Sequence, residues 1–245
     1  MVVKGERGVG GEWGGHLSPF VLRRLPAPSI TLLPDPFARD KPGAMTQLDF
    51  FDRPSARTTV LMRSGYLFDY ENPDAAGMSI EDIAHALSQE PRWIGACEPM
   101  MTVAQHCVIT SYLVSEARAW DALMHDVDEA VTKDLPTPFK LLIDRRAGHD
   151  LMRRVLRPIR QAFAHEFRFR LDLHAVKQAD RAAAAQERRD LLPRAWMDWG
   201  SAADAPADTA KPVSPPDARA LFLERYHQLG GEARRRNPPT GKAAP

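Results

Sequence analysis

Histidines and aspartates occur along the chain in an order that suits a divalent cation. His125 and Asp126 are adjacent. His106 precedes them in TVAQHC, and Asp180 follows in VKQAD. Imidazole nitrogens and carboxylate oxygens together are ligands for Mn²⁺, Co²⁺, Fe²⁺ or Zn²⁺. Four protein ligands on an ion that prefers six leave positions for water and a substrate oxygen, which predicts a hydrolytic site.

Two further carboxylates are candidates for catalysis. Glu129 comes four residues after His125 and three after Asp126, so on a helix it would return to the same face. There it would lie near the ion without being a ligand, where it can orient or deprotonate water. Asp134 begins the segment DLPTP. A carboxylate on a proline-fixed turn is positioned with little loss of entropy.

Cations are expected close to a phosphoryl group, because phosphoryl transfer depends on positioning and on charge stabilisation. The candidates are Lys140, Lys177 and Arg92. Lys177 stands three residues before Asp180, on the same expected helix face. The alternative for each lysine is an ordinary surface position, and Asp128 is expected to face solvent or to pair locally.

The first helices that must position these groups begin at capping residues. Ser79 is expected to cap a helix that runs to about Gln89, before Pro91. Thr102 is expected to cap the helix that carries His106, running to about Ala117. These two caps place the first ligand inside a regular helix.

The remaining elements follow from spacing and from proline. A helix from Trp120 to about Thr132 would carry the His-Asp pair, and Pro136 and Pro138 would then stop it and set a rigid turn. Further helices are expected from about 150 to 169, kinked at Pro158, and from about 173 to 190. With only a short extended piece or hairpin at 63–69, the expected fold class is an all-α bundle.

Composition limits the partners and the compartment. Of the 245 residues, 44% are hydrophobic, which allows one domain with a real core. The 33 basic and 32 acidic residues give a net charge of +1, so polymeric nucleic acid is not an expected main partner. No apolar run approaches a membrane span and the N-terminus has no hydrophobic signal region. Two cysteines make no disulfide framework, so a cytoplasmic location is expected.

Three segments are expected. Residues 1–57 read as a poorly structured N-terminal extension, with Met45 as an alternative start. Residues 58–199 would form the catalytic domain. Residues 200–245 read as a low-complexity tail with one short helix around 217–229, and the run Arg234–Arg236 reads as solvated. Both tails are expected to be disordered.

The motifs together resemble the HD-domain metal-dependent phosphohydrolases, and within them the 5′-deoxynucleotidase-like branch. The resemblance is carried by TVAQHC, HDVDEAVTKDLPTPFK and VKQAD, and extends over roughly Arg63 to Pro193. RSGYLFDYENP and SIEDIAHALSQEPRW also look like phage and prophage members. The family often has glycine before the aspartate of DxPxP, where this chain has Lys133.

The resemblance implies an HD-domain helical bundle, with His106, His125, Asp126 and Asp180 as metal ligands. Glu129 and Asp134 would serve catalysis. Arg92 and Trp93 match an Arg-Trp pair that contacts the phosphate and the sugar or base, although Trp93 can equally be a core anchor. The implied activity is removal of the 5′-phosphate from deoxynucleoside monophosphates, in a possible homo-oligomer.

Three alternatives stay open at this point. One is a triphosphohydrolase acting on a deoxynucleoside triphosphate such as dATP, which needs the same ion and lysines. Another is a non-catalytic nucleotide-sensing protein of the same fold. The third is a DNA-interaction module that uses the arginine-rich tail.

Overall fold

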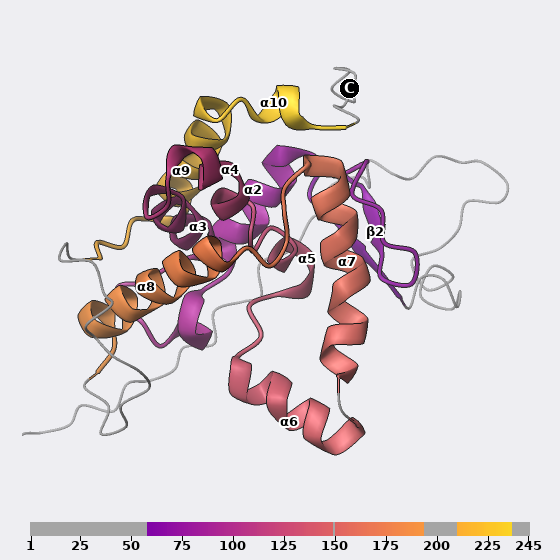
Figure 1. Ribbon diagram of the computed structural model, residues 1–245, viewed down its shortest axis with the longest axis horizontal. Coiled ribbons are helices and arrows are strands. Elements are labelled where there is room, and N and C mark those ends of the chain that lie inside the picture. The colour runs from indigo at the N-terminus through magenta and orange to yellow at the C-terminus, as the bar shows by residue number, and fades with distance from the viewer. Residues whose placement is uncertain (1–57, 149, 194–209, 237–245) are drawn as a thin grey trace, which may run out of the picture. The chain divides into compact units, whose positions relative to one another are not determined.

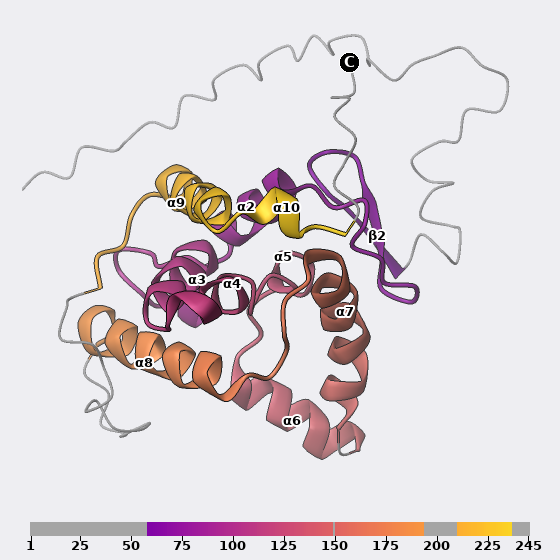
Figure 2. The same cartoon turned by 45° about the horizontal axis from the view of Figure 1, so that its top comes forward.

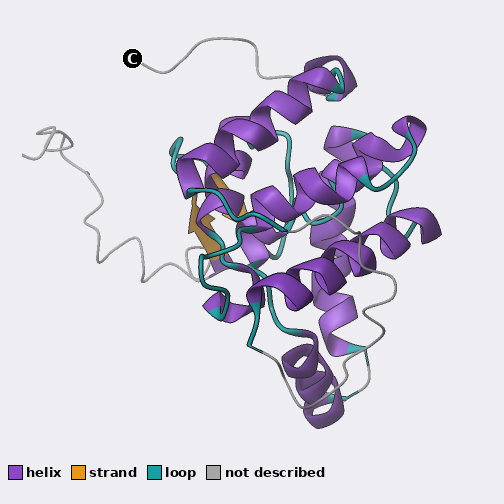
Figure 3. Ribbon diagram, turned by 90° about the vertical axis from the view of Figure 1, so that its left-hand side faces the viewer, coloured by secondary structure: helices purple, strands orange, loops and turns teal. Residues whose placement is uncertain are grey.

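Helices make up nearly all of the regular structure in the computed structural model, which describes residues 58–148, 150–193 and 210–236 (Figure 1, Figure 3). The all-α class is confirmed. The expectations for residues 1–57, 200–209 and 237–245 lie outside the described residues.

The expected short hairpin is a two-stranded antiparallel sheet. Strand β1 (Thr59–Leu61) pairs with β2 (Leu67–Asp69), and Val60 stands opposite Phe68. Phe68 is fully buried and stacks on Phe163, with 5.7 Å between the ring centroids. The hairpin is therefore attached to the helical core through an alternate residue of β2.

The first two helices begin at the expected caps. In front of α2 (Ile80–Gln89), the Ser79 hydroxyl accepts a hydrogen bond from the backbone N–H of Asp82. The Thr102 hydroxyl does the same for Gln105 at the start of α3 (Val103–Tyr112). Side-chain caps of this kind satisfy donors that the first turn leaves without partners.

The expected continuation of α3 to about Ala117 is wrong. A separate helix, α4 (Glu116–Leu123), starts after Ser115, whose backbone is extended (φ −62°, ψ 153°). Ser115 interrupts the helix because serine favours the non-helical backbone of a cap position. The spacing of apolar residues continues across the break between α3 and α4, so it did not indicate that the helix ends there.

The expected single helix from Trp120 to Thr132 is also wrong. Helix α4 ends at Leu123, and the one-turn helix α5 spans Glu129–Thr132. Between them the backbone bonds reach back three residues, as in Val127 N–H to the Met124 carbonyl (3.3 Å) and Glu129 N–H to the Asp126 carbonyl (3.0 Å). These tighter turns place His125 and Asp126 in a connection, so the helical angle between neighbours does not apply to them.

The prolines after α5 begin a helix rather than only fixing a turn. Pro136 occupies the N-cap position of α6 (Thr137–Ala147), and Pro138 lies in its first turn, where a missing N–H costs nothing. Helix α6 buries none of its residues and packs against α7 (Leu151–Phe167), as Figures 1 and 2 show. Pro158 lies inside α7, as expected.

The core centres on α3, which contacts α2, α4, α8 and α9. Figure 2 shows α3 and α4 between α8 (His174–Leu191) on one side and α9 (Pro215–Gln228) on the other. The largest fully buried side chains include Leu87, Leu123, Phe163 and Phe222 from the helices, and Met101 and Met124 from residues next to them.

The end of the described chain belongs to the core, although it was expected to lie in a tail. The short helix expected near 217–229 is present as α9, and its Ala218, Phe222 and Tyr226 are buried. After α10 (Gly231–Arg234), Arg235 is only 3% exposed, so the expected solvation of this arginine is wrong. The proline-rich flanks of α9 hid its apolar face, because that composition is typical of unstructured chain.

Within the described part of the chain, no helix combines the length and the apolar character that crossing a bilayer requires. Cys97 and Cys107 are both free and buried.

Candidate metal centre

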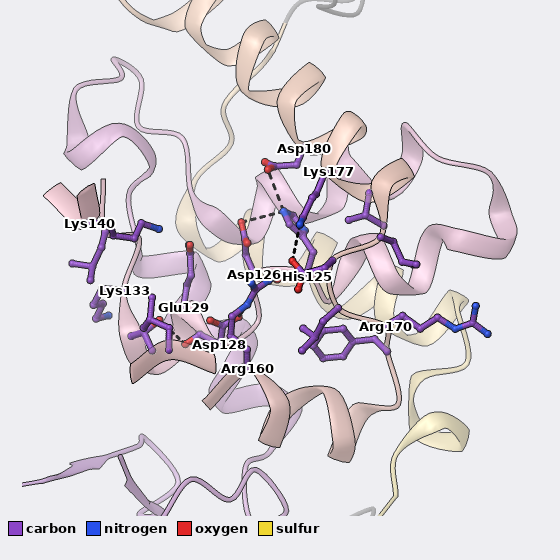
Figure 4. A pocket seen from close by; sticks show the side chains of 18 residues that line it. His125, Asp126, Asp128, Glu129, Lys133, Lys140, Arg160, Arg170, Lys177 and Asp180 are labelled. Atoms are coloured by element: carbon purple, nitrogen blue, oxygen red, sulfur yellow. Dashed lines mark hydrogen bonds and ion pairs between the residues drawn. The ribbon is translucent and has the colours of Figure 1, made fainter. Parts of the chain in front are cut away.

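The four predicted ligands converge from separate elements. His106 comes from α3, His125 and Asp126 from the turn after α4, and Asp180 from α8. One ligand atom of each lies within 4.8 Å of every other, so the group could hold a metal ion. His106 Nε2 is 3.1 Å from Asp180 Oδ1, and His125 Nε2 is 3.1 Å from Asp126 Oδ2. Figure 4 shows His125, Asp126 and Asp180 directed toward one another.

Both imidazoles are oriented with Nε2 toward this centre. His125 Nδ1 lies 2.7 Å from the carbonyl of Ala122, which can only accept, so Nδ1 carries the proton. The Nε2 atom is buried and points at two carboxylates, 3.1 Å from Asp126 Oδ2 and 3.8 Å from Asp180 Oδ1. A nitrogen that faces two carboxylate oxygens in this way can share a bound cation with them.

The electrostatics of the cluster favour positive charge at its centre. Burial opposes the charged form of His125, but the Asp126 carboxylate outweighs burial and holds the pKa of His125 well above its ordinary value. Burial likewise opposes the charge of Asp126, and the His125 imidazole outweighs it, so the pKa of Asp126 is lowered. Against burial, His106 and His125 also lower the pKa of Asp180. A divalent cation would satisfy the same carboxylates.

Glu129 and Asp134 lie beside the cluster as uncoordinated carboxyl groups. Burial, followed by the charges of Asp126 and Asp134, raises the pKa of Glu129 well above its usual range. Burial also raises the pKa of Asp134, against the opposite effect of Arg92. Glu129 Oε2 is buried without a hydrogen-bond partner among the described residues. A buried carboxyl group with a raised pKa keeps its proton to higher pH than an exposed one, and it can then donate that proton.

Glu187 is the residue of this region that the sequence motifs did not indicate. Its side chain is fully buried, and it accepts from His106 Nδ1 at 2.5 Å, from Arg92 Nε at 3.2 Å and from Trp93 Nε1 at 2.9 Å. Burial opposes its charge, but His106 and Arg92 hold the pKa of Glu187 at about 2. Glu187 follows Asp180 by two helical turns, and this spacing on α8 was the available signal.

The side chains of Arg92 and Trp93 therefore contact Glu187 behind the four predicted ligands and do not extend into the cavity. Arg92 Nη1 also pairs with Asp134 Oδ2 at 3.3 Å, and its side chain is 11% exposed. Arg92 thus links two carboxylates, Glu187 and Asp134. Neither Arg92 nor Trp93 lines the cavity described next.

A cavity of about 230 Å³ opens beside the ligands (Figure 4). His125, Asp126, Asp180 and Glu129 line it. Its basic lining residues are Lys133, Lys140, Arg160, Arg170 and Lys177.

The cations of the cavity differ in how they are paired. Lys177 Nζ lies 2.7 Å from Asp172, and Lys133 Nζ lies 3.0 Å from Glu90. Arg160 pairs with Asp128 at 3.5 Å. The Lys140 ammonium group makes no hydrogen bond or ion pair with another described residue, which leaves it available to an anion in the cavity.

Of the two alternatives for Asp128, exposure to solvent is wrong, because the residue is only 5% exposed. Its carboxylate pairs with Arg160 at 3.5 Å. Burial raises the pKa of Asp128 to about 6 despite the charge of Arg160.

Known proteins give the chain a family but no activity. YfdR of Escherichia coli K12 is 33% identical over 176 residues, covering 68% of this chain and 92% of YfdR. The chain belongs to the family of YfdR. A protein of Rhodobacter capsulatus, RCAP_rcc00048, is a further relative at 30% identity, covering 69% of this chain and 93% of its own length. Both relatives carry the description "uncharacterized". No protein-family model matches the chain.

Proposed function

We propose that this protein is an HD-domain, metal-dependent phosphohydrolase that removes the 5′-phosphate from deoxynucleoside monophosphates. One observation carries the proposal: four ligand atoms lie within 4.8 Å of one another, with Nε2 of His125 directed at Asp126 and Asp180, beside a cavity lined by both carboxylate and cationic side chains. A closed structural site would have no such opening.

The ligand set is His106, His125, Asp126 and Asp180. A bound divalent cation would lower the pKa of water and polarise a phosphoryl oxygen. The two imidazoles present Nε2, since Nδ1 of each is occupied by an acceptor, the carbonyl of Ala122 or the carboxylate of Glu187. The mixed nitrogen and oxygen donors suit Mn²⁺, Co²⁺, Fe²⁺ or Zn²⁺.

The protein's own groups would supply the proton transfers and bind the phosphate. Glu129, buried beside Asp126 with its raised pKa, would exchange a proton with water or with the leaving oxygen. Asp134, held by Arg92 and by the Glu90 carboxylate that accepts its backbone N–H at 3.1 Å, would orient the attacking water. Lys140 would neutralise a phosphate oxygen, with Lys177 opposite Asp172 as a second cation.

The size of the cavity favours a monophosphate over a triphosphate. Its volume of about 230 Å³ is below the range of about 300–1,000 Å³ that small-molecule sites usually have. Such a space would enclose a phosphate and part of a sugar and leave the base near the opening. A triphosphate would require the chain to open further.

A nucleotide panel tests the proposal. Purified protein with Mn²⁺ or Co²⁺ is incubated with each deoxynucleoside mono- and triphosphate, and inorganic phosphate and tripolyphosphate are measured separately. Phosphate from the monophosphates, absent in Asp126→Asn, is the expected result. Release of tripolyphosphate from a triphosphate would mean that the substrate is a deoxynucleoside triphosphate and not a monophosphate. Nucleotide binding without any hydrolysis would contradict the enzyme and favour a sensor.

A further inference from the structure

Glu187 joins two parts of the site that the chain keeps apart. Oε1 faces His106 Nδ1 on α3, at 2.5 Å. Oε2 accepts from Arg92 Nε at 3.2 Å and from Trp93 Nε1 at 2.9 Å. Each oxygen thus serves a different partner, and the side chain is fully buried, so no water competes for either.

The turn that Glu187 holds has an unfavourable backbone. Trp93 (φ 57°, ψ 35°) and Ile94 (φ 52°, ψ 28°) both lie in the left-handed region. That region is uncommon outside glycine, and it is sterically unfavourable for a β-branched or bulky residue. Two such residues in succession persist only if the surroundings fix them.

Backbone contacts hold the start of this turn to the residues before α3: Pro91 bridges to Thr102, and Arg92 N–H donates to the Met101 carbonyl at 2.8 Å. Within the turn, Ala96 N–H donates to the Trp93 carbonyl at 3.0 Å. The side chains of Arg92 and Trp93 connect the turn to α8 through Glu187. Arg92 in turn reaches Asp134.

We propose that Glu187 is a positioning residue that couples the metal centre to the Arg92–Trp93 turn. Through Oε1 it keeps the proton of His106 on Nδ1, so that Nε2 faces the ion. Through Oε2 it holds the strained turn, and through Arg92 it orients Asp134. The effect on the metal depends only on the geometry of the cluster. The effect on substrate rests on the proposed function.

A glutamine at position 187 cannot serve both sides. If its amide oxygen faces His106, its NH₂ group meets the donors of Arg92 and Trp93. If the amide is turned over, the NH₂ group faces His106 Nδ1, which must then accept, so the proton moves to Nε2 and blocks ligation. Glu187→Gln therefore keeps the shape of the side chain and removes one of its two functions.

The test is a titration of the metal-free, full-length protein with Co²⁺. Binding is measured by calorimetry and by the visible absorption of the bound ion. Glu187→Gln is expected to weaken Co²⁺ affinity about 10- to 100-fold, as losses of such outer partners do. Glu187→Asp should recover part of the affinity, since its carboxylate can still accept from His106. The tryptophan fluorescence, to which Trp93 contributes as one of five tryptophans, should change in Glu187→Gln with the ion absent as well as present.

Glu166→Gln is the matched control, because Glu166 is also buried and also faces an arginine, Arg235, away from the cluster. It should lower stability and leave Co²⁺ affinity unchanged. Circular dichroism establishes that each variant is folded before titration. Glu187→Gln that binds Co²⁺ like the unaltered protein would overturn the proposal. Failure of nucleotide hydrolysis in the unaltered protein would refute the proposed function alone, since the Co²⁺ comparison does not use turnover.

Discussion

Two buried glutamates each face an arginine, but in very different surroundings. Arg235 donates to Glu166 at 3.2 Å and to the Met78 carbonyl at 2.8 Å, and its guanidinium lies over the Phe167 ring. Neither Glu166 nor Arg235 lines the cavity beside the ligands. Glu187 instead stands behind a histidine whose other nitrogen faces Asp126 and Asp180, and these two carboxylates line that cavity.

The comparison shows that a buried ion pair does not by itself indicate function. The Glu166–Arg235 pair joins the chain after α10 to α7 and to the residues before α2, which is a structural role. The Glu187 network contains carboxylates in excess of its fixed cations and adjoins a cavity. Excess negative charge beside an opening is what a cation-dependent site requires.

The largest expected effect comes from removing a ligand. His125→Ala should abolish Co²⁺ binding and nucleotide hydrolysis, because it removes one of the four ligand groups, the imidazole whose Nε2 lies 3.1 Å from Asp126. Calorimetric titration measures the first effect and phosphate release the second. His85→Ala, outside the cluster, is the control and should behave as the unaltered protein. Unchanged Co²⁺ stoichiometry in His125→Ala would remove the metal centre from consideration.

Next in size is the loss of the proton-transfer group. Glu129→Gln should reduce kcat by about 10²- to 10⁴-fold, the usual contribution of general acid–base catalysis, while Co²⁺ still binds. Steady-state kinetics and a Co²⁺ titration on the same preparation separate the two effects. Equal losses of kcat in Glu129→Gln and Glu166→Gln would mean that burial of the carboxylate matters and its position does not.

The structural pair should show the opposite behaviour. Arg235→Met should lower the free energy of unfolding by about 3–5 kcal/mol, because it removes the guanidinium that faces the buried Glu166 carboxylate. Urea denaturation measures this loss, and Co²⁺ affinity should not change. The double variant Arg235→Met/Glu166→Leu should recover much of the stability, since it removes the buried carboxylate together with the arginine that faced it. A double variant no more stable than the single one would contradict this role for the pair.

Metal removal should distinguish the two regions by stability. A cation at 100 times its Kd stabilises the folded chain by about 2.7 kcal/mol. Chelation should therefore lower the Tm of the unaltered protein and of Arg235→Met alike, and leave His125→Ala unaffected. Differential scanning calorimetry with and without a chelator measures the shifts. A chelator effect that persists in His125→Ala would place the bound cation elsewhere.

The smallest expected effect concerns the cavity wall. Lys140→Ala should raise KM for a monophosphate about tenfold, near the lower end of the 1.5–3 kcal/mol that a hydrogen bond to a charged group contributes. Lys140→Arg should restore most of the affinity. Lys177→Ala is expected to have a smaller effect, since Lys177 already pairs with Asp172. A larger KM effect from Lys177 than from Lys140 would reverse their assigned roles.

The sequence predicted the groups that depend on local chemistry and missed those that depend on packing. The caps Ser79 and Thr102 act through hydrogen bonds to residues three positions later, so the order of residues in the sequence is enough to predict them. The four ligands were also indicated, because the short motifs around them, TVAQHC, HDVDE and VKQAD, resemble those of the HD-domain phosphohydrolases. Their arrangement around one point was an expectation that only the folded chain could test.

The misses have physical causes of the same kind. The break between α4 and α5 depends on bonds that reach back three residues, and no residue between Met124 and Asp128 is a strong helix breaker. Glu187 was passed over because its role depends on Arg92, 95 positions away along the chain. The core position of α9 depends on α2 and α3, which pack against it.

The connection before Asp134 shows that an ion pair can stabilise a backbone conformation that would otherwise favour glycine. Lys133 adopts φ 69°, ψ 157°, a conformation that glycine reaches without steric cost. One oxygen of Glu90 pairs with the Lys133 ammonium, and the other accepts the N–H of Asp134. A search pattern that demands glycine before this aspartate would pass over chains that, like this one, use a lysine and a distant glutamate to secure the same bend.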